Sequence, residues 1–370
     1  YTFFRVTYNN GFCEHLEGKN VYITRTPIYK NGGSTWDYLC KLADETGLRS
    51  EKDDESLLSR QYKLVDLMRD NVPLAQYLGN KKELATYPMP QQVYYPFGCN
   101  ASQKTAVETA LTHQVSIIQG PPGTGKTQTI LNIIANLLME NKSVLVVSYN
   151  NSAVENVAEK LSREGLGFLV AQLGSKQNKE KFIANQQEYP AMTDWMLDKE
   201  TTIRSLAIDS LQAVSNGFDA QLRQAKQKAE YDALLEESTY NQRQEENHTV
   251  DEWLNGKPSA KIIKLLNRYK RMIEEGDKPG LWLRLQWTFL FGTKIFTFLN
   301  RKATDAIKSL ESAYYISRKS EIERELESIA SALQIIDTRK SMEELRSSSL
   351  QLLKDRIARR YNSKQRTKFT

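Results

Sequence analysis

The residues best suited to chemistry lie between Gly120 and Gln128. This segment reads GPPGTGKTQ and contains the full pattern G-x-x-x-x-G-K-[ST]. It follows a β-branched stretch, residues 115–118, and precedes an amphipathic helix predicted from Lys126 to Met139. The glycines let successive backbone N–H groups turn toward a β-phosphate, and the N-terminus of a helix adds positive potential. We therefore predict a binding loop for a nucleoside triphosphate.

The side chains of this loop and its flanks have separate expected roles. Lys126 would neutralise the β- and γ-phosphate oxygens and Thr127 would ligate Mg²⁺, so these two are the predicted catalytic residues. Gln103 lies 17 residues before Gly120 on a predicted helix, where an amide can present a donor and an acceptor to adenine and select ATP. Its alternative role is that of a surface helix residue. The predicted binding residues for ATP are Gln103, Gly120, Pro121, Pro122, Gly123, Thr124, Gly125, Lys126, Thr127 and Gln128.

A second polar cluster follows the apolar stretch SVLVVS. It consists of Ser148, Asn150, Asn151 and Ser152. Ligands of open α/β folds bind at the carboxyl edge of the sheet, and short hydroxyl and amide groups there suit phosphate contacts along a single strand of nucleic acid. A helix N-cap is the alternative for these residues. We predict that the four residues bind nucleic acid.

The elements that must position these residues alternate between strands and helices. The stretches VSII, SVLVVS and GFLVAQ read as buried strands, and helices of about 10 to 15 residues separate them. This alternation predicts a parallel sheet with helices on its faces over residues 93–195. Residues 1–92 predict a small mixed α/β region, joined to it by an extended connector that ends at Asn100.

Residues 196–360 predict a long helical hairpin. Five apolar residues step by 4, 3, 4 and 3, as in a coiled-coil seam: Ile322, Leu326, Ile329, Leu333 and Ile336. Residues 206–235 carry a similar spacing, and the segments NGKPSA and GDKPG are expected to form turns between the arms. An arm of 35 to 40 residues would reach about 50 to 60 Å. A structural stalk is slightly favoured over a device that binds a protein partner.

Composition gives weaker constraints on partners. The chain has 51 Lys and Arg against 45 Asp and Glu, a net charge of +6 that permits a nucleic-acid partner without requiring one. Residues 361–370 form a basic tail, and the seven basic residues between Lys354 and Lys368 are more typical of a solvated helix end than of a backbone-binding site. Cys13, Cys40 and Cys99 are too few and too scattered for a disulfide scaffold, so we expect a reducing cytoplasm.

One apolar stretch, Gly280 to Leu299, is just long enough to span a bilayer at about 20 residues. Arg284, Gln286 and Lys294 interrupt it, and polar helical regions flank it. We therefore predict a buried helical tip and regard membrane insertion as the weaker alternative.

Three segments carry a resemblance to a known family. YPFGCNASQKTAV, IIQGPPGTGKTQTILNII and SYNNSAVENVAEKL resemble the Q motif, motif I and motif Ia of superfamily 1B helicases, the class of the nonsense-mediated-decay helicase and senataxin. The arrangement is most similar to bacterial members with a coiled-coil insertion in the first RecA-like domain. The resemblance covers about residues 94–185 and implies a RecA-like P-loop fold with ATP-driven 5′-to-3′ movement on single-stranded DNA or RNA.

By motif position, the resemblance assigns adenine recognition to Gln103 and strand contacts to Ser148, Asn150 and Asn151. Three aromatic residues of the first segment offer base stacking, although packing is favoured for each of them: Tyr94, Tyr95 and Phe97.

The sequence departs from the family in its acidic residues. Members need an Asp-Glu pair at the end of a later strand and arginines from a second RecA-like domain. Asp251-Glu252 is the nearest match, but no apolar strand precedes it. We therefore expect the front part of a helicase, which alone binds ATP weakly or not at all and hydrolyses none at a useful rate. The alternative is a nucleotide-binding scaffold or sensor that holds partners through the hairpin.

Overall fold

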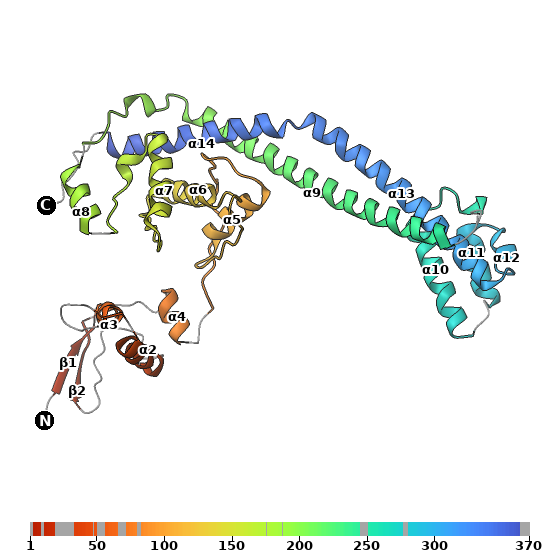
Figure 1. Ribbon diagram of the computed structural model, residues 1–370, viewed down its shortest axis with the longest axis horizontal. Coiled ribbons are helices and arrows are strands. Elements are labelled where there is room, and N and C mark those ends of the chain that lie inside the picture. Colours follow the sequence, from red (N-terminus) through yellow and green to blue (C-terminus); the bar gives the residue numbers. More distant parts are fainter. Residues whose placement is uncertain are drawn as a thin grey trace. The chain divides into compact units, whose positions relative to one another are not determined.

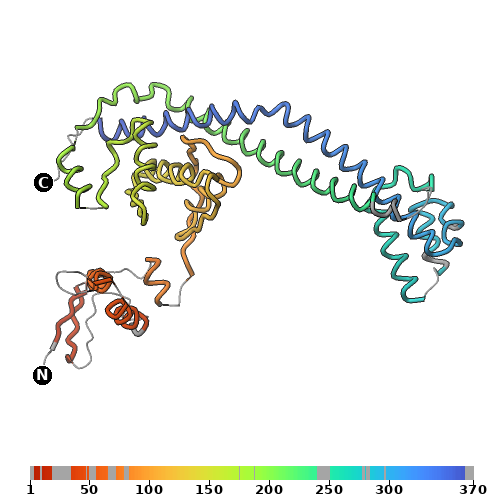
Figure 2. The backbone as a smooth tube through the Cα atoms, in the orientation of Figure 1, coloured from red at the N-terminus to blue at the C-terminus, as the bar shows by residue number. Residues whose placement is uncertain are grey.

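The computed structural model describes residues 3–8, 11–18, 33–46, 48–49, 56–65, 72–79, 83–174, 176–186, 188–244, 251–276 and 280–362. These residues fall into two compact units. The first contains residues 1–93 and 102–133, and the second contains residues 94–101 and 134–370. Figure 1 labels the elements, and Figure 2 traces the backbone in the same orientation.

The N-terminal part of the first unit combines a strand pair with three helices. Strand β1 (Phe3–Thr7) pairs antiparallel with β2 (Cys13–Glu17). The helices are α2 (Gly33–Thr46), α3 (Leu57–Lys63) and α4 (Pro73–Gly79). Trp36 of α2 is buried with Leu78 of α4, and its ring stacks on Tyr62 of α3 at a centroid distance of 5.0 Å. The predicted mixture of strands and helices is therefore present in this part.

The remainder of the first unit supports the glycine loop. Helix α5 (Ala101–Thr112) and helix α6 (Lys126–Met139) lie on either side of it in the sequence. The connector docks on the end of α5, because the Tyr87 N–H donates to the Thr112 carbonyl at 2.7 Å and the Ala85 N–H donates to Gln114 Oε1 at 2.9 Å. Both predicted helices are present.

The second unit is built on long helices that run antiparallel. Helix α9 (Glu200–Gln244) lies beside α13 (Ala303–Ile335) and α14 (Thr338–Tyr361), as Figure 1 shows. Gly217 of α9 faces Thr338, whereas the Tyr231 hydroxyl, further along α9, donates to Glu323 at 2.9 Å. Residue numbers thus increase along α9 in the direction in which they decrease along α14 and α13, so α9 is antiparallel to both. The predicted pair of antiparallel arms is present, and its coiled-coil geometry stays a prediction.

The segment between the two arms is larger than the predicted turns. It forms a tip, residues 251–302, with a 3₁₀ turn (Glu252–Leu254) and three helices: α10 (Ser259–Glu274), α11 (Leu281–Phe291) and α12 (Ile295–Phe298). Trp287, Phe291 and Phe298 are buried in its core, and Trp253 meets the last two rings at 6.0 and 5.3 Å. The predicted burial of the apolar stretch is thus confirmed in part, because Leu285, Phe289 and Leu290 of the same stretch are exposed. Among the described residues, no helix is long and apolar enough to cross a membrane.

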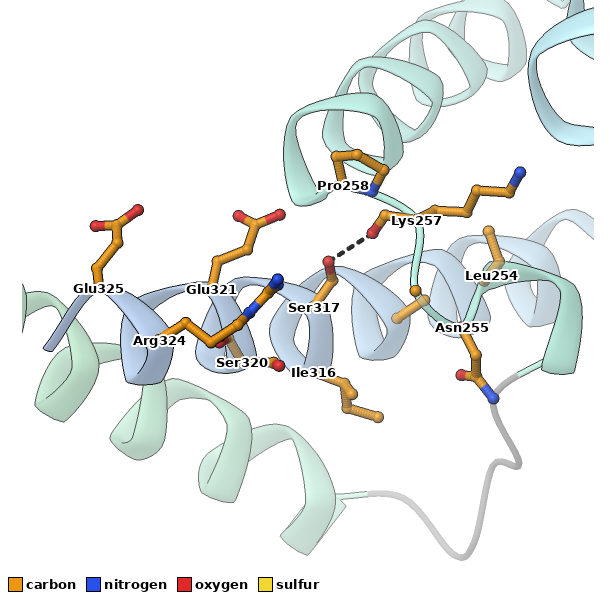
Figure 3. Close-up of a pocket in the computed structure, with 12 residues that line it drawn as sticks. Leu254, Asn255, Lys257, Pro258, Ile316, Ser317, Ser320, Glu321, Arg324 and Glu325 are labelled. Carbon is orange, nitrogen blue, oxygen red and sulfur yellow. Dashed lines mark hydrogen bonds between the residues drawn. The ribbon is translucent and has the colours of Figure 1, made fainter. Parts of the chain in front are cut away.

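A charged junction joins the tip to the arms. Arg318 of α13 donates to the Glu230 carboxylate of α9 at 2.7 and 2.9 Å. Glu321, one turn further on, accepts from the Ser259 N–H at 2.9 Å at the start of α10. A groove of about 610 Å³ lies at this junction, and in Figure 3 the Ser317 hydroxyl donates to the Lys257 carbonyl across it, at 2.6 Å.

The predicted parallel sheet is not found in the described residues, where β1 and β2 are the only named strands. Residues 115–118 and 143–148 have irregular backbone, and Gly167–Leu169 of the third predicted strand is a 3₁₀ helix. A strand exists only by pairing with a neighbour, and these stretches have no ladder partner here. Leu145 and Val147 are accordingly 87% and 79% exposed.

Shorter helices of the second unit lie between α6 and α9 in the sequence. They are α7 (Asn151–Arg163), α8 (Lys176–Ala184) and a 3₁₀ turn (Thr193–Trp195). Helix α7 confirms the helix predicted over SAVENVAEKL.

Candidate functional site

The loop before α6 is a tight turn that uses two glycines with left-handed backbone. Gly123 has φ +86° and Gly125 has φ +78°, a region that residues with a Cβ rarely adopt. The Thr124 hydroxyl donates to the Pro121 carbonyl at 2.9 Å and closes the turn. The loop leads directly into a helix of 14 residues, whose first N–H groups have no acceptor within the helix. This geometry suits an anion.

Lys126 places its charge at the same loop. Its Nζ donates to the carbonyl oxygens of Gly120 at 2.5 Å and Pro121 at 2.9 Å. Both carbonyls belong to exposed residues, so a phosphate oxygen can replace them as acceptors of the ammonium protons. Thr127 follows on the first turn of α6 and is half-buried, as is Gln128. A lysine cation, a hydroxyl and turned backbone N–H groups together fit a triphosphate with Mg²⁺.

Gln103 contacts the loop itself. Its side chain is buried, and Nε2 donates to the carbonyls of Thr124 at 3.1 Å and Gly125 at 3.4 Å. A Cβ on Gly125 would lie 2.1 Å from that nitrogen. Gln103 therefore fixes the backbone of the loop, and the alternative of a surface helix residue is wrong. Its contact with adenine stays a prediction.

The cluster after residue 147 is a helix cap with exposed neighbours. Asn150 Oδ1 accepts from the Ser152 N–H at 3.1 Å and from its hydroxyl at 2.9 Å, at the N-terminus of α7. The Asn150 N–H in turn donates to Ser148 Oγ at 3.2 Å. The alternative role of N-cap is thus confirmed for Asn150, while Ser148 and Asn151 remain exposed. Their contact with nucleic acid stays a prediction.

Tyr149 is a residue that the sequence analysis missed. Its side chain is fully exposed within this polar loop. The sequence could have indicated this residue, because Tyr149 is an aromatic residue between residues with hydroxyl and amide side chains. Exposed aromatic rings stack on bases without regard to base sequence.

Two of the three aromatic residues of the connector have packing roles, as favoured, and the role of Phe97, which is half-buried, stays a prediction. Tyr94 and Tyr95 are buried. The Tyr94 backbone exchanges two hydrogen bonds with the Asn136 side chain, at 2.9 and 2.7 Å, and the Tyr95 N–H donates to Ser349 Oγ at 3.1 Å. They are therefore part of the second unit's core.

Asp251 and Glu252 do not form a catalytic pair. They lie at the 3₁₀ turn of the tip, where the Asp251 carboxylate accepts two hydrogen bonds from Arg301 at 2.8 Å and one from Ser309 at 2.9 Å. The carboxylate thus holds the tip together.

The basic end of α14 also contributes to packing. Arg359 donates to Asp355 at 2.7 Å, and Lys354 lies 5.3 Å from the Trp195 ring centroid. Residues 363–370 of the predicted tail lie outside the described residues.

With this geometry established, comparison with known proteins identifies the family. A family profile described as "AAA domain" matches residues 98–368, about three quarters of the chain. The chain belongs to this AAA domain family. The range of the family match includes the glycine loop, the cap loop and the helical arms.

This AAA domain protein matches curated relatives over part of its length, and two of the following three are named as helicases. "DNA polymerase alpha-associated DNA helicase A" of Schizosaccharomyces pombe is 45% identical over 74 residues, 20% of this chain and 11% of the relative. "Regulator of nonsense transcripts 1" of Caenorhabditis elegans is 34% identical over 135 residues, 34% of this chain and 13% of the relative. "ATP-dependent helicase upf1" of S. pombe is 38% identical over 92 residues, 23% of this chain and 10% of the relative.

The matches confirm the resemblance to superfamily 1 helicases, over part of the chain. The chain spans roughly a tenth of the length of these relatives. No solved structure matches.

Proposed function

We propose that this AAA domain chain binds Mg-ATP through the Gly120–Gln128 loop and forms the front part of a superfamily 1 helicase that acts on single-stranded nucleic acid. One observation carries the proposal. A phosphate-loop sequence stands before a helix N-terminus, with Gly123 and Gly125 in left-handed backbone and the Lys126 ammonium at the loop. A RecA-like sheet around this loop is part of the proposal.

The test is binding of a fluorescent ATP analogue with and without Mg²⁺. Lys126→Ala removes charge-assisted hydrogen bonds worth about 1.5–3 kcal/mol, so the affinity should fall roughly 10- to 150-fold. Lys142→Ala is the control, because Lys142 is an exposed lysine that pairs with Glu140 just beyond the other end of α6. Because the chain alone is expected to bind weakly, the analogue is titrated to millimolar concentration, and equal affinities for the two variants would contradict the proposal.

The metal can be tested separately at Thr127. Thr127→Val keeps the shape of the side chain and removes the hydroxyl that would ligate Mg²⁺. Chelation of Mg²⁺ should weaken analogue binding by the wild type and leave binding by this variant unchanged. An equal response of both proteins would remove Thr127 from the metal site.

Hydrolysis is expected to be absent from the 370-residue chain. The Asp251 carboxylate is committed to Arg301 and Ser309, so Asp251 cannot serve as the acid that helps to hold Mg²⁺. Phosphate release at saturating ATP, with single-stranded DNA or RNA present, should stay at the level of Lys126→Ala. Turnover that disappears on Lys126→Ala would place the missing acid within this chain.

A further inference from the structure

We propose that the exposed face of α10 binds the phosphate backbone of a nucleic acid, as a second contact remote from the ATP loop. The inference rests on the proposed function only in taking nucleic acid as the partner. It identifies the part of the hairpin that would engage this partner.

Helix α10 has two different faces. Its buried face packs into the tip core through Ile262, Leu265, Leu266 and Tyr269. The opposite face exposes four basic side chains with spacings of 3, 4 and 3 residues, so that they lie in one stripe: Lys261, Lys264, Arg268 and Arg271. We call these four residues the α10 stripe.

The α10 stripe places four cations without a described acidic partner in one row on one helix face. Other exposed cations of the second unit, such as Arg223 and Lys226, also have no ion-pair partner among the described residues. Within the ranges that the structure describes, none of its four members forms an ion pair. Lys270, on the flank of the same helix, pairs with Glu311 at 2.5 Å. Arg301 pairs with Asp251 and Arg359 with Asp355. Neighbouring like charges repel, so an unpaired stripe is favourable chiefly where an anion binds.

The tip is one of two segments with a large excess of positive charge; the other is the basic segment from Lys354 to Lys368. Residues 251–302 contain eleven Lys and Arg against five Asp and Glu. Their balance of +6 equals the net charge of the whole 370-residue chain. The tip therefore carries a net positive charge that attracts a polyanion.

The α10 stripe is also held in a fixed orientation. Glu321 of α13 accepts from the Ser259 N–H at 2.9 Å and from its hydroxyl at 2.5 Å, which fixes the first turn of α10. Arg318 ties α13 to Glu230 of α9. Figure 3 shows Glu321 on α13, facing the turn that leads into α10. A positioned row of charges loses less entropy on binding than flexible tails do.

The dimensions and side chains favour a nucleic-acid backbone. From Lys261 to Arg271 the helix rises about 15 Å, close to the rise of four nucleotides at 3.4 Å each. No large apolar side chain between residues 260 and 271 is exposed, so this face has no ring to stack on bases and none to insert into a lipid surface. The contact should therefore be independent of base sequence.

The decisive experiment is a salt titration of binding by the 370-residue chain. Fluorescence anisotropy would follow labelled single-stranded DNA, single-stranded RNA and duplex DNA between 50 and 200 mM KCl. The test variant carries Lys261→Gln, Lys264→Gln, Arg268→Gln and Arg271→Gln. Glutamine keeps the helix propensity, and circular dichroism checks the fold.

A matched control removes the same charge elsewhere on the long helices. It carries Arg223→Gln, Lys226→Gln, Lys228→Gln and Arg339→Gln, all exposed and none in an ion pair with a described residue. Loss of four phosphate contacts should reduce the slope of log K against log[salt] by about 2.8 for single strands and about 3.6 for duplex. The control should keep the wild-type slope. A double variant, Lys261→Gln with Lys264→Gln, should show half of this reduction in slope. It serves as the test if the fourfold variant misfolds.

The outcomes separate this inference from the proposed function. Equal slopes for the wild type and the fourfold α10 variant overturn the inference; if Tyr149→Ala still weakens binding, the proposed function stands. No salt-dependent binding by the wild type overturns both. Vesicles of phosphatidylserine and phosphatidylcholine serve as a second probe, and loss of vesicle binding alone in the α10 variant would assign the stripe to lipid and also overturn the inference.

Discussion

The contact between Gln103 and the glycine loop allows a sharp test of what each glycine does. Gly123 and Gly125 both have left-handed backbone, so alanine at either position should cost about 1–2 kcal/mol in local stability. The two differ in their surroundings. A Cβ at Gly123 meets nothing within 4 Å, whereas a Cβ at Gly125 would lie 2.1 Å from Gln103 Nε2.

Gly125→Ala should therefore also displace the Gln103 side chain. That side chain donates to the carbonyls of Thr124 and Gly125, and two such hydrogen bonds are worth about 0.5–1.5 kcal/mol each. The expected cost is about 1–2 kcal/mol for Gly123→Ala and about 2–5 kcal/mol for Gly125→Ala. Amide hydrogen exchange of peptides from α5 and α6, read by mass spectrometry, gives the local opening free energy.

The double-mutant cycle decides the mechanism. With Gln103→Ala already present, Gly125→Ala should cost no more than Gly123→Ala, because the displaced side chain is gone. Equal costs of the two substitutions in the wild-type chain would refute the reasoning. So would an excess cost of Gly125→Ala that persists without Gln103.

Three further predictions concern the second unit. Tyr149→Ala should weaken binding of single-stranded nucleic acid by about 1–3 kcal/mol in an anisotropy titration, while Tyr149→Phe keeps it, because the exposed ring stacks; equal losses would rule out stacking. Gly217→Ala places a Cβ 2.3 Å from the Thr338 hydroxyl, so the free energy of unfolding measured in urea should fall by about 1–3 kcal/mol. A rise in this free energy, from the higher helix propensity of alanine, would show that the helices separate freely. Arg318→Met breaks the pair with Glu230 and should lower tip stability, followed by tryptophan fluorescence, by about 1–2 kcal/mol, and an unchanged midpoint would contradict its anchoring role.

The sequence predicted the features that local chemistry determines. Helices α5, α6 and α7 follow from apolar periodicity and capping residues, which act within a few positions of the chain. The glycine pattern determined the turn before Lys126, because only glycine takes left-handed backbone without strain. The contact of Gln103 with Gly125 was beyond such reasoning, since it joins residues 22 positions apart.

The tip shows where local reasoning fails. Pro258 and Gly276 mark chain breaks, and the turns predicted there are present at residues 255–256 and 275–276, but the fold of the tip between the arms was not predicted. In the structure, Ile262 of α10 packs in one core with Trp287 and Leu310, which lie 25 and 48 positions further along the chain. Burial in a core assembled from distant segments is not encoded in any one window of sequence, and for this reason the α10 stripe was not recognised as the outer face of a packed helix.

The sheet poses the opposite problem, because strand propensity is local and pairing is not. Ile117, Leu145 and Val147 have the β-branched or apolar character of buried strands, yet each is at least 79% exposed. Apolar side chains of this size gain about 1.5–3 kcal/mol each on full burial, so their exposure in irregular backbone marks surface that other strands would stabilise by covering. Strand propensity in a sequence thus shows that a segment is able to pair, and the ladder forms only when its partner strands are present. We therefore expect residues 143–148 to become more protected from hydrogen exchange when a segment that pairs with them as a strand is supplied. Protection that stays low in the full-length protein would show that this stretch is a loop and that the predicted sheet is wrong at this position.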